Sequence, residues 1–177
     1  LYGRIVEGNS EAPQTLGDLS DDSANQIAWQ EKYLHPEMLA ALGSLSDCPF
    51  REIADGIYSF PLFSEAFCQE LIAMAEEKKG WSAGRNNHLD KRIGDNYYEN
   101  YPTVDTQLFQ LGLEEVWKRF VDLYIAPVAR HLYNNYKTRD INLAFVVRYR
   151  FDEQAKLSAH HDSSTYTINV ALNSSEE

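Results

Sequence analysis

Basic residues, cysteines and long apolar runs are all scarce in this sequence. Lys and Arg number 16 against 27 Asp and Glu, so the formal net charge is −11. Because a protein that follows a phosphate backbone needs clustered cations, this balance argues against a nucleic acid as the partner. No apolar stretch approaches the roughly 20 residues of a membrane-spanning helix, and no signal-peptide pattern opens the chain. The two cysteines, Cys48 and Cys68, lack the spacing of a zinc clamp.

The residues that are present indicate a folded domain with an appended arm. Apolar residues make up 44% and aromatic residues 12% of the 177 positions, which is typical of globular proteins. This length suits one domain with a proper core. Residues 8–26 collect Gly, Pro, Ser, Asn and Asp with few apolar side chains, as linkers do. We therefore predict a linker or surface arm over residues 1–28 and a domain over residues 29–177.

Hydrophobic periodicity predicts helices in the first part of the chain and strands in the last part. Ser64 and Gly80 bracket the clearest helix, which carries apolar residues at helical spacing and lysines in its last turn. The segment 81–103 is polar, aromatic and long, which predicts a functional loop or lid. The order of elements predicts an α+β fold. The other predicted elements are one or two short helices over 28–42, an edge strand over 56–64, a helix over 111–133 that breaks at Pro127, and strands over 143–150 and 165–172.

Three His-x-acid triplets occur, and a chain with five His and 27 acidic residues contains such triplets by chance. Residues 35–37 straddle a proline at a predicted helix start and are interpreted as a surface turn. Residues 88–90 lie in the polar segment and are interpreted as a solvated turn. The triplet His160-His161-Asp162 differs because it directly precedes a predicted strand.

The alternation of side chains selects two of these three residues as a candidate metal-binding pair. In an extended chain residues i and i+2 point to the same side, so His160 and Asp162 share one side and His161 takes the other. An imidazole and a carboxylate are two thirds of the two-His-one-carboxylate set that holds non-haem Fe(II). A polar turn that contains imidazoles remains the alternative on the residues alone. The predicted strand that follows has one polar face, formed by Thr165, Thr167 and Asn169. If this face is buried, its polar groups need hydrogen-bond partners or a ligand.

The stretch FVVRYRFDEQAKLSAHHDSSTYTINVALN resembles the C-terminal catalytic domain of the procollagen-lysine 2-oxoglutarate 5-dioxygenases, the lysyl hydroxylases. The resemblance extends upstream through WQEKYL, FPLFSEAFCQEL, YENYPTVDTQ and YIAPVARHLY, and so covers residues 29–173. It implies the double-stranded β-helix (jelly roll) of the Fe(II)/2-oxoglutarate oxygenases, with flanking helices and truncated at its C-terminal side. Residues 29–177 would then be the N-terminal portion of such a dioxygenase domain.

The resemblance also implies roles for five residues, each by its position in the matching motif. His160 and Asp162 match two iron ligands at the catalytic centre. Tyr149 and Asn169 match residues that contact 2-oxoglutarate, and Arg92 in the polar segment matches an arginine that reaches the same pocket.

The activity implied by the resemblance is hydroxylation of peptidyl lysine at C5 in procollagen, with O2 and 2-oxoglutarate as co-substrates. Fe(II) would be the metal and L-ascorbate would keep it reduced. The implied setting is the lumen of the rough endoplasmic reticulum, with peripheral attachment to its membrane and a homodimer of the full-length protein. Two alternatives stay open: a 2-oxoglutarate oxygenase with another target residue, and a non-catalytic β-helix module that binds collagen or a hydroxylase partner.

One departure from the family pattern concerns the end of the sequence. Residues 163–177 contain no His, Lys or Arg, whereas the family needs a distal His as third iron ligand and an Arg for 2-oxoglutarate. We expect both to lie downstream, in a longer gene product of which this sequence is a fragment, rather than to be lost in a degenerate homologue. A two-ligand iron site binds metal weakly, so the 177 residues alone are not expected to turn over.

Overall fold

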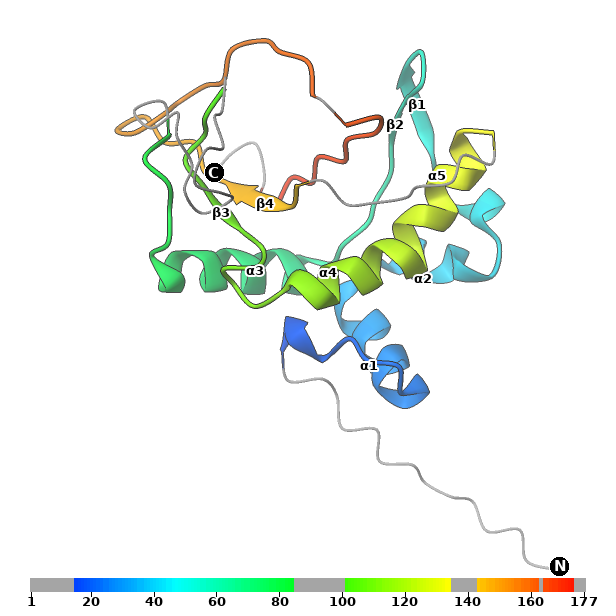
Figure 1. The fold of residues 1–177 in the computed structure, drawn as a ribbon. Coiled ribbons are helices and arrows are strands. Elements are labelled where there is room, and N and C mark those ends of the chain that lie inside the picture. Colours follow the sequence, from blue (N-terminus) through cyan, green and yellow to red (C-terminus); the bar gives the residue numbers. More distant parts are fainter. Residues whose placement is uncertain (1–14, 85–100, 135–142, 163, 174–177) are drawn as a thin grey trace, which may run out of the picture. The chain divides into compact units, whose positions relative to one another are not determined.

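A computed structural model of the chain describes residues 15–84, 101–134, 143–162 and 164–173 (Figure 1). The chain divides into two compact units, Leu1–Leu71 with Glu115–Thr138, and Ile72–Glu114 with Arg139–Glu177. Helices and two small antiparallel sheets together make an α+β fold, as predicted. The described strands pair only two by two, so the predicted double-stranded β-helix is not established by them. Among these described residues no helix is both long and apolar enough to cross a membrane.

The first unit is mainly helical, and its opening helices confirm the helices predicted over 28–42, although the first begins at Ser23, inside the predicted arm. Helix α1 begins where the Asp22 carboxylate accepts the N–H groups of Ala24 and Asn25. Helix α2 begins at a proline, and the preceding His35 accepts the Glu37 N–H at its Nδ1, 3.3 Å away. His35 therefore lies in a turn at a helix start, as its triplet predicted. The elements up to this point are η1 (Leu16–Asp18), α1 (Ser23–Tyr33), α2 (Pro36–Ala40), η2 (Ala41–Gly43) and η3 (Leu45–Asp47).

The helix predicted over 111–133 is interrupted before Pro127, as expected. Helix α4 spans Glu114–Phe120, a π-helical turn η5 spans Val121–Ile125, and α5 spans Ala126–Leu132. Proline has no N–H to donate to the preceding turn, and its ring crowds that turn. A π-helical turn is a known way for a helix to accommodate such a local misfit.

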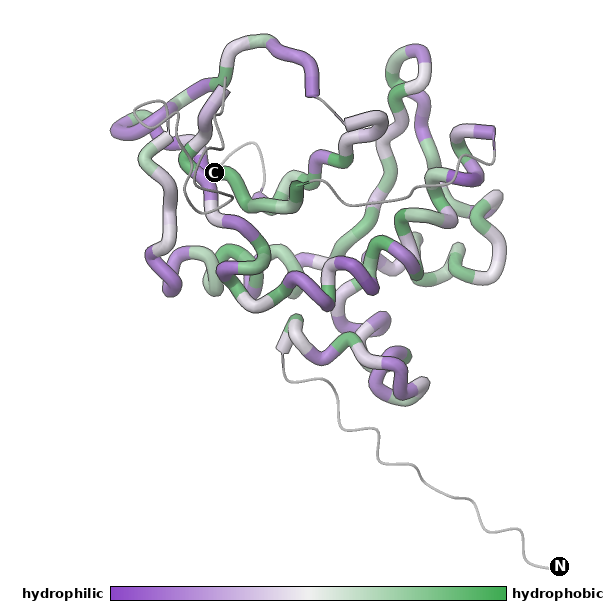
Figure 2. The backbone as a smooth tube through the Cα atoms, viewed as in Figure 1, coloured by the Kyte–Doolittle hydropathy of each residue, from purple (hydrophilic) through white to green (hydrophobic). Residues whose placement is uncertain are grey.

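Along α4 and α5 hydrophobic and hydrophilic residues follow one another in turn (Figure 2).

Trp29 lies at the centre of the aromatic core of this unit. It is 1% exposed, and its Nε1 donates to the Leu16 carbonyl at 3.2 Å. Its ring contacts four other rings at centroid distances of 5.1 to 6.4 Å. One of them is on α1 itself and the others are on α3 (Glu65–Lys78), α4 and η5; the four are Tyr33, Phe67, Phe120 and Tyr124. Buried aromatic pairs contribute beyond their area alone, so we expect this cluster to stabilise the unit.

The described part of the predicted arm is packed into the first unit. Leu16 and Leu19 are 1% and 5% exposed, and the Leu16 N–H donates to Glu70 Oε1 at 2.8 Å. The composition of this stretch is that of a linker, but these two leucines bury enough surface to hold η1 in place. Residues 1–14 lie outside the described residues, and the limits 1–28 and 29–177 stay a prediction.

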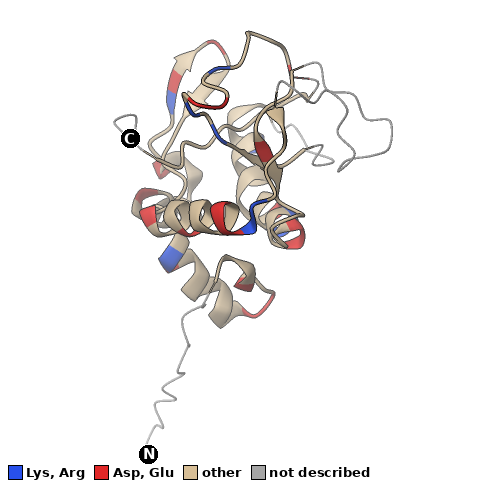
Figure 3. Cartoon of the chain, turned by 90° about the vertical axis from the view of Figure 1, so that its left-hand side faces the viewer, with Lys and Arg blue, Asp and Glu red and all other residues tan. Residues whose placement is uncertain are grey.

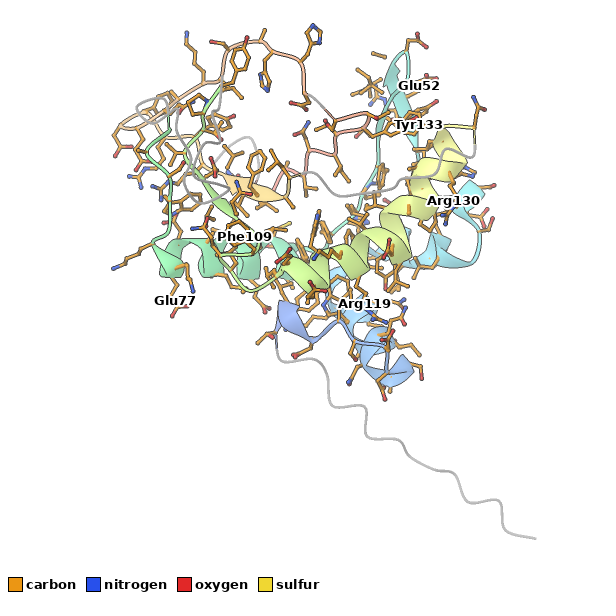
Figure 4. The ribbon with its side chains drawn as sticks, in the orientation of Figure 1. Glu52, Glu77, Phe109, Arg119, Arg130 and Tyr133 are labelled. Atoms are coloured by element: carbon orange, nitrogen blue, oxygen red, sulfur yellow. The ribbon has the colours of Figure 1, made fainter. Side chains whose placement is uncertain are left out.

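A hairpin of β1 (Arg51–Ala54) and β2 (Ile57–Ser59) completes the first unit. Gly56, with φ of +69°, makes the turn between them. Tyr133 at the end of α5 donates its hydroxyl to the Gly56 carbonyl at 3.1 Å, and Figure 4 shows it beside the hairpin that carries Glu52. The predicted edge strand is therefore present as β2, which ends before Pro61. β1 was not predicted, because its sequence REIA shows too short an alternation.

Helix α3 (Glu65–Lys78) crosses the division between the units and confirms the clearest prediction. The Ser64 hydroxyl caps it by accepting the Phe67 N–H at 3.3 Å. The residue that adopts the left-handed backbone conformation after the helix is Lys79, with φ of +50°, rather than Gly80. The predicted helix is right, and its stop comes one residue earlier.

The second unit is built on β3 (Asp105–Gln107) and β4 (Phe145–Val147), which pair antiparallel and lie side by side (Figure 1). β4 lies within the strand predicted over 143–150, and its buried member is Val146, while Phe145 and Val147 are 43% and 37% exposed. β3 was not predicted, because its residues are polar although all three are buried.

Hydrogen bonds satisfy the buried carboxylate of Asp105 in β3. Its Oδ2 accepts from the hydroxyls of Thr103 at 3.0 Å and Ser82 at 3.3 Å. The Ser82 N–H also donates to the Asp105 carbonyl at 2.8 Å. These bonds hold together the two ends of the predicted lid, 81–103, whose residues 85–100 lie outside the described part.

The strand predicted over 165–172 is wrong for the described structure, in which these residues form no ladder. Thr165 through Asn169 are all exposed. Alternation specifies which side chains share a face, but a strand also needs a neighbour to complete its hydrogen bonds. No described strand pairs with this segment.

Charged residues form local pairs on both units. Arg119 on α4, labelled in Figure 4, pairs with Asp21. The hydrogen bond and the charge of the guanidinium lower the pKa of the Asp21 carboxyl. In the second unit Arg148 pairs with Glu76 at 3.0 Å and Glu153 at 2.8 Å. Figure 3 shows Lys and Arg scattered along the described ribbon rather than joined in a stripe.

Both cysteines are free thiols in the described structure. Cys48 is buried and Cys68 partly buried, and burial raises the pKa of each thiol. Since the thiolate is the reactive form of cysteine, burial disfavours the reactive form of both residues.

Gly84 is a position where a larger residue should destabilise the second unit. Its φ is +58°, and a Cβ there would lie 2.7 Å from both Gln154 Oε1 and Val104 Cγ2. We expect Gly84→Ala to lower the free energy of unfolding by at least about 1–2 kcal/mol, the cost of a left-handed non-glycine residue. Urea unfolding measures this. Gly43→Ala is the control, because a Cβ at Gly43 meets no atom within 4 Å; equal loss in both variants would contradict the prediction.

Candidate functional site

The predicted pair is brought together in the second unit. His160 Nε2 lies 3.3 Å from Asp162 Oδ1, and the two side chains are 26% and 46% exposed. Both residues lie in an irregular segment after β4, so local hydrogen bonds rather than a ladder set their geometry. The outcome agrees with the prediction that His160 and Asp162 share one side of the chain.

The tautomer of His160 follows from its other nitrogen. Nδ1 lies 2.9 Å from the carbonyl of Ser158, which can only accept, so Nδ1 carries the hydrogen. In a neutral imidazole Nε2 is then a bare acceptor that faces the Asp162 carboxylate oxygen. Two acceptors at this distance repel unless a cation lies against both, either a metal ion or a proton on Nε2. A histidine that binds a metal through one ring nitrogen usually donates the hydrogen of the other to a backbone carbonyl, a carboxylate or water.

Tyr101 supports the ring of His160. The two rings stack with centroids 4.9 Å apart and an interplanar angle of 24°. This contact was not predicted, because Tyr101 lies 59 positions earlier and nothing in its local pattern points to the histidine.

Two hydroxyl groups support Asp162. The Thr167 hydroxyl donates to Asp162 Oδ2 at 2.6 Å, and Ser164 Oγ lies 2.9 Å from Thr167 Oγ1. Thr167 belonged to the predicted polar face, whereas its role as a partner of the aspartate was not foreseen.

The pair fits two neighbouring positions of one metal ion. Donors that each lie about 2.1 Å from a metal, at right angles to one another, stand about 3 Å apart, close to the observed 3.3 Å. Within the described ranges no set of three or more His, Cys, Asp or Glu is grouped so that it could hold a metal. His160 and Asp162 thus supply two metal-binding donor atoms, Nε2 and Oδ1.

Among the described residues, Tyr149 and Asn169 make no hydrogen bond or ion pair with this pair. Tyr149 is 45% exposed, and partial burial raises the pKa of its hydroxyl. Asn169 is exposed. Arg92 and the triplet at 88–90 lie outside the described residues. The assignment of Tyr149, Asn169 and Arg92 to 2-oxoglutarate remains a prediction.

Comparison with known proteins gives one family and a consistent group of relatives. A family model described as OGFOD2-like domain matches residues 27–138. The chain is 53% identical over 155 residues to the procollagen lysyl hydroxylase and glycosyltransferase of Acanthamoeba polyphaga mimivirus, covering 88% of this chain and 17% of that protein. It is 45% identical over 158 residues to procollagen-lysine,2-oxoglutarate 5-dioxygenase 1 of Homo sapiens, and the match covers 88% of this chain and 21% of that protein.

The enzyme of the same name from Gallus gallus is 42% identical over 175 residues, which cover 97% of this chain and 23% of that protein. A match of this extent includes the segment that carries His160 and Asp162. The chain spans about a fifth of the length of these curated relatives.

Proposed function

The chain belongs to the OGFOD2-like domain family, and from this membership we propose that it forms part of an Fe(II)- and 2-oxoglutarate-dependent dioxygenase that hydroxylates peptidyl lysine at C5 in procollagen. The observation that carries the proposal is the 3.3 Å approach of His160 Nε2 and Asp162 Oδ1, in a segment similar to enzymes named for this reaction. An imidazole and a carboxylate so placed are donors that suit non-haem Fe(II).

His160 and Asp162 would hold the metal. Tyr149, Asn169 and Arg92 would contact 2-oxoglutarate through hydroxyl, amide and guanidinium groups. When bound, iron and 2-oxoglutarate supply the oxidising chemistry, in which O2, 2-oxoglutarate and a lysine C–H bond yield succinate, CO2 and a hydroxylysine. The chain's own contribution is to orient these groups and to keep His160 in the tautomer that leaves Nε2 free.

The finer features of the fold and its setting belong to the same proposal. β3 and β4 would be strands of a double-stranded β-helix, with flanking helices supplied by the first half of the chain. L-ascorbate would keep the iron reduced. The rough endoplasmic reticulum lumen, with peripheral membrane attachment and a homodimer, is the proposed setting of the whole protein.

The names of the relatives favour an enzyme over a non-catalytic collagen-binding module, since each is named as a hydroxylase or dioxygenase. An oxygenase with another target residue would share the metal ligands, so the substrate peptide has to separate these two possibilities.

The test uses the whole protein in which this sequence occurs. With a collagen-like peptide that contains X-Lys-Gly, we expect succinate release that requires both Fe(II) and 2-oxoglutarate, stops with a chelator and returns with added Fe(II). Mass spectrometry should place one added oxygen on lysine. A peptide with lysine replaced by arginine is the control. Hydroxylation of proline instead, or release of succinate without iron, would contradict the proposal.

A further inference from the structure

We propose that Thr167 is a positioning residue for Asp162: its hydroxyl holds Oδ2 of the carboxylate, so that Oδ1 alone is directed toward the metal. The inference rests on the proposed function, because it concerns how one of the proposed iron ligands is held. Its basis is the 2.6 Å bond from Thr167 to Asp162 Oδ2, together with the 3.3 Å approach of Oδ1 to His160 Nε2.

The direction of the hydrogen bonds is determined by chemistry. A carboxylate only accepts, so Thr167 donates its single hydroxyl hydrogen to Asp162. Thr167 Oγ1 is then left as an acceptor, and Ser164 Oγ, 2.9 Å away, becomes its donor. The hydroxyl of Ser164 therefore donates to Thr167, and the hydroxyl of Thr167 donates to Asp162. In such a series of hydrogen bonds, each bond strengthens the next by polarising it.

The two oxygens of the Asp162 carboxylate therefore differ in their contacts: Oδ2 accepts the Thr167 hydroxyl, and Oδ1 faces His160. Asp162 is 46% exposed, so packing alone does not hold its rotation. A carboxylate that turned freely could offer both oxygens to one metal ion and occupy a further coordination position. The bond from Thr167 favours binding through Oδ1 alone, which leaves that position to the co-substrate. His160 is held in a parallel way, by the Ser158 carbonyl at Nδ1 and by the ring of Tyr101.

The test compares metal affinity in Thr167→Val, Thr167→Ser and Thr165→Val variants of the whole protein. Valine keeps the shape of threonine without the hydroxyl, and serine restores the hydroxyl. Thr165 is the matched control, an exposed threonine two positions away with no hydrogen bond to the described residues. Mn(II) binding, followed by electron paramagnetic resonance without any turnover, gives the affinity, and thermal unfolding reports on the fold.

We expect Thr167→Val to weaken Mn(II) binding about 10- to 100-fold, the usual effect of removing a second-shell partner. Thr167→Ser and Thr165→Val should bind like the unmodified protein, and all four proteins should unfold at similar temperatures. Unmodified affinity in Thr167→Val would overturn the inference and leave the proposed function intact. Loss in Thr167→Ser as well would also overturn it, since the hydroxyl would not be the cause. If the unmodified protein bound no Mn(II), the proposed function itself would fail.

Discussion

Replacing His160 by alanine in the whole protein is expected to abolish lysine hydroxylation with little effect on folding. A second-shell change costs on the order of 10–100-fold in metal affinity, and His160 is a proposed direct ligand, so the loss should exceed about a hundredfold. The fold should tolerate the change, because His160 is exposed and its described partners are the Ser158 carbonyl, the Tyr101 ring and Asp162. Succinate release and Mn(II) binding measure the loss.

The neighbouring His161 provides the control. It has the same side chain, is also exposed, and makes no described contact with Asp162. His161→Ala should keep at least half of the activity, whereas Asp162→Ala should behave like His160→Ala. Full turnover in His160→Ala, or equal losses at both histidines, would show that the pair is not the metal site.

Replacing Trp29 by alanine is expected to destabilise the first unit by about 3–5 kcal/mol, the usual cost of removing a fully buried tryptophan. Its ring contacts four other rings and its Nε1 bonds the Leu16 carbonyl, so both packing and a buried hydrogen bond are lost. Denaturant unfolding, followed by circular dichroism, measures the change.

Two further variants separate the causes. Trp29→Phe keeps an aromatic ring but removes the donor to Leu16, and should cost about 1–3 kcal/mol, the penalty for an unpaired buried acceptor. Trp117→Ala removes a tryptophan that stacks on Phe120 at 5.2 Å but lies only partly buried. It should cost clearly less than Trp29→Ala. A larger loss for Trp117→Ala would place the centre of the core elsewhere.

Local signals predicted the helices well and the sheets poorly. The cap at Ser64 and the apolar spacing that follows it are complete within α3, so the sequence suffices to predict that helix. β3 is polar, yet buried, because Ser82 and Thr103 complete the hydrogen bonds of Asp105 from outside the strand. The tertiary fold brings such partners together, so they produce no periodic pattern in the sequence of the strand. The segment 165–172 shows the opposite error, since it has the alternation of a strand but no described strand beside it.

By itself the sequence predicted the α+β order of elements, the helix cap at Ser64 and the candidate pair His160 and Asp162, because these depend on neighbours within a few positions along the chain. The resemblance, also present in the sequence, pointed to iron and 2-oxoglutarate. The tertiary structure alone decided which atoms meet: Nδ1 of His160 on the Ser158 carbonyl, its ring on Tyr101, and the Thr167 hydroxyl on Oδ2 of Asp162. These contacts depend on how the chain folds back on itself, and spacing in sequence carries no record of that path.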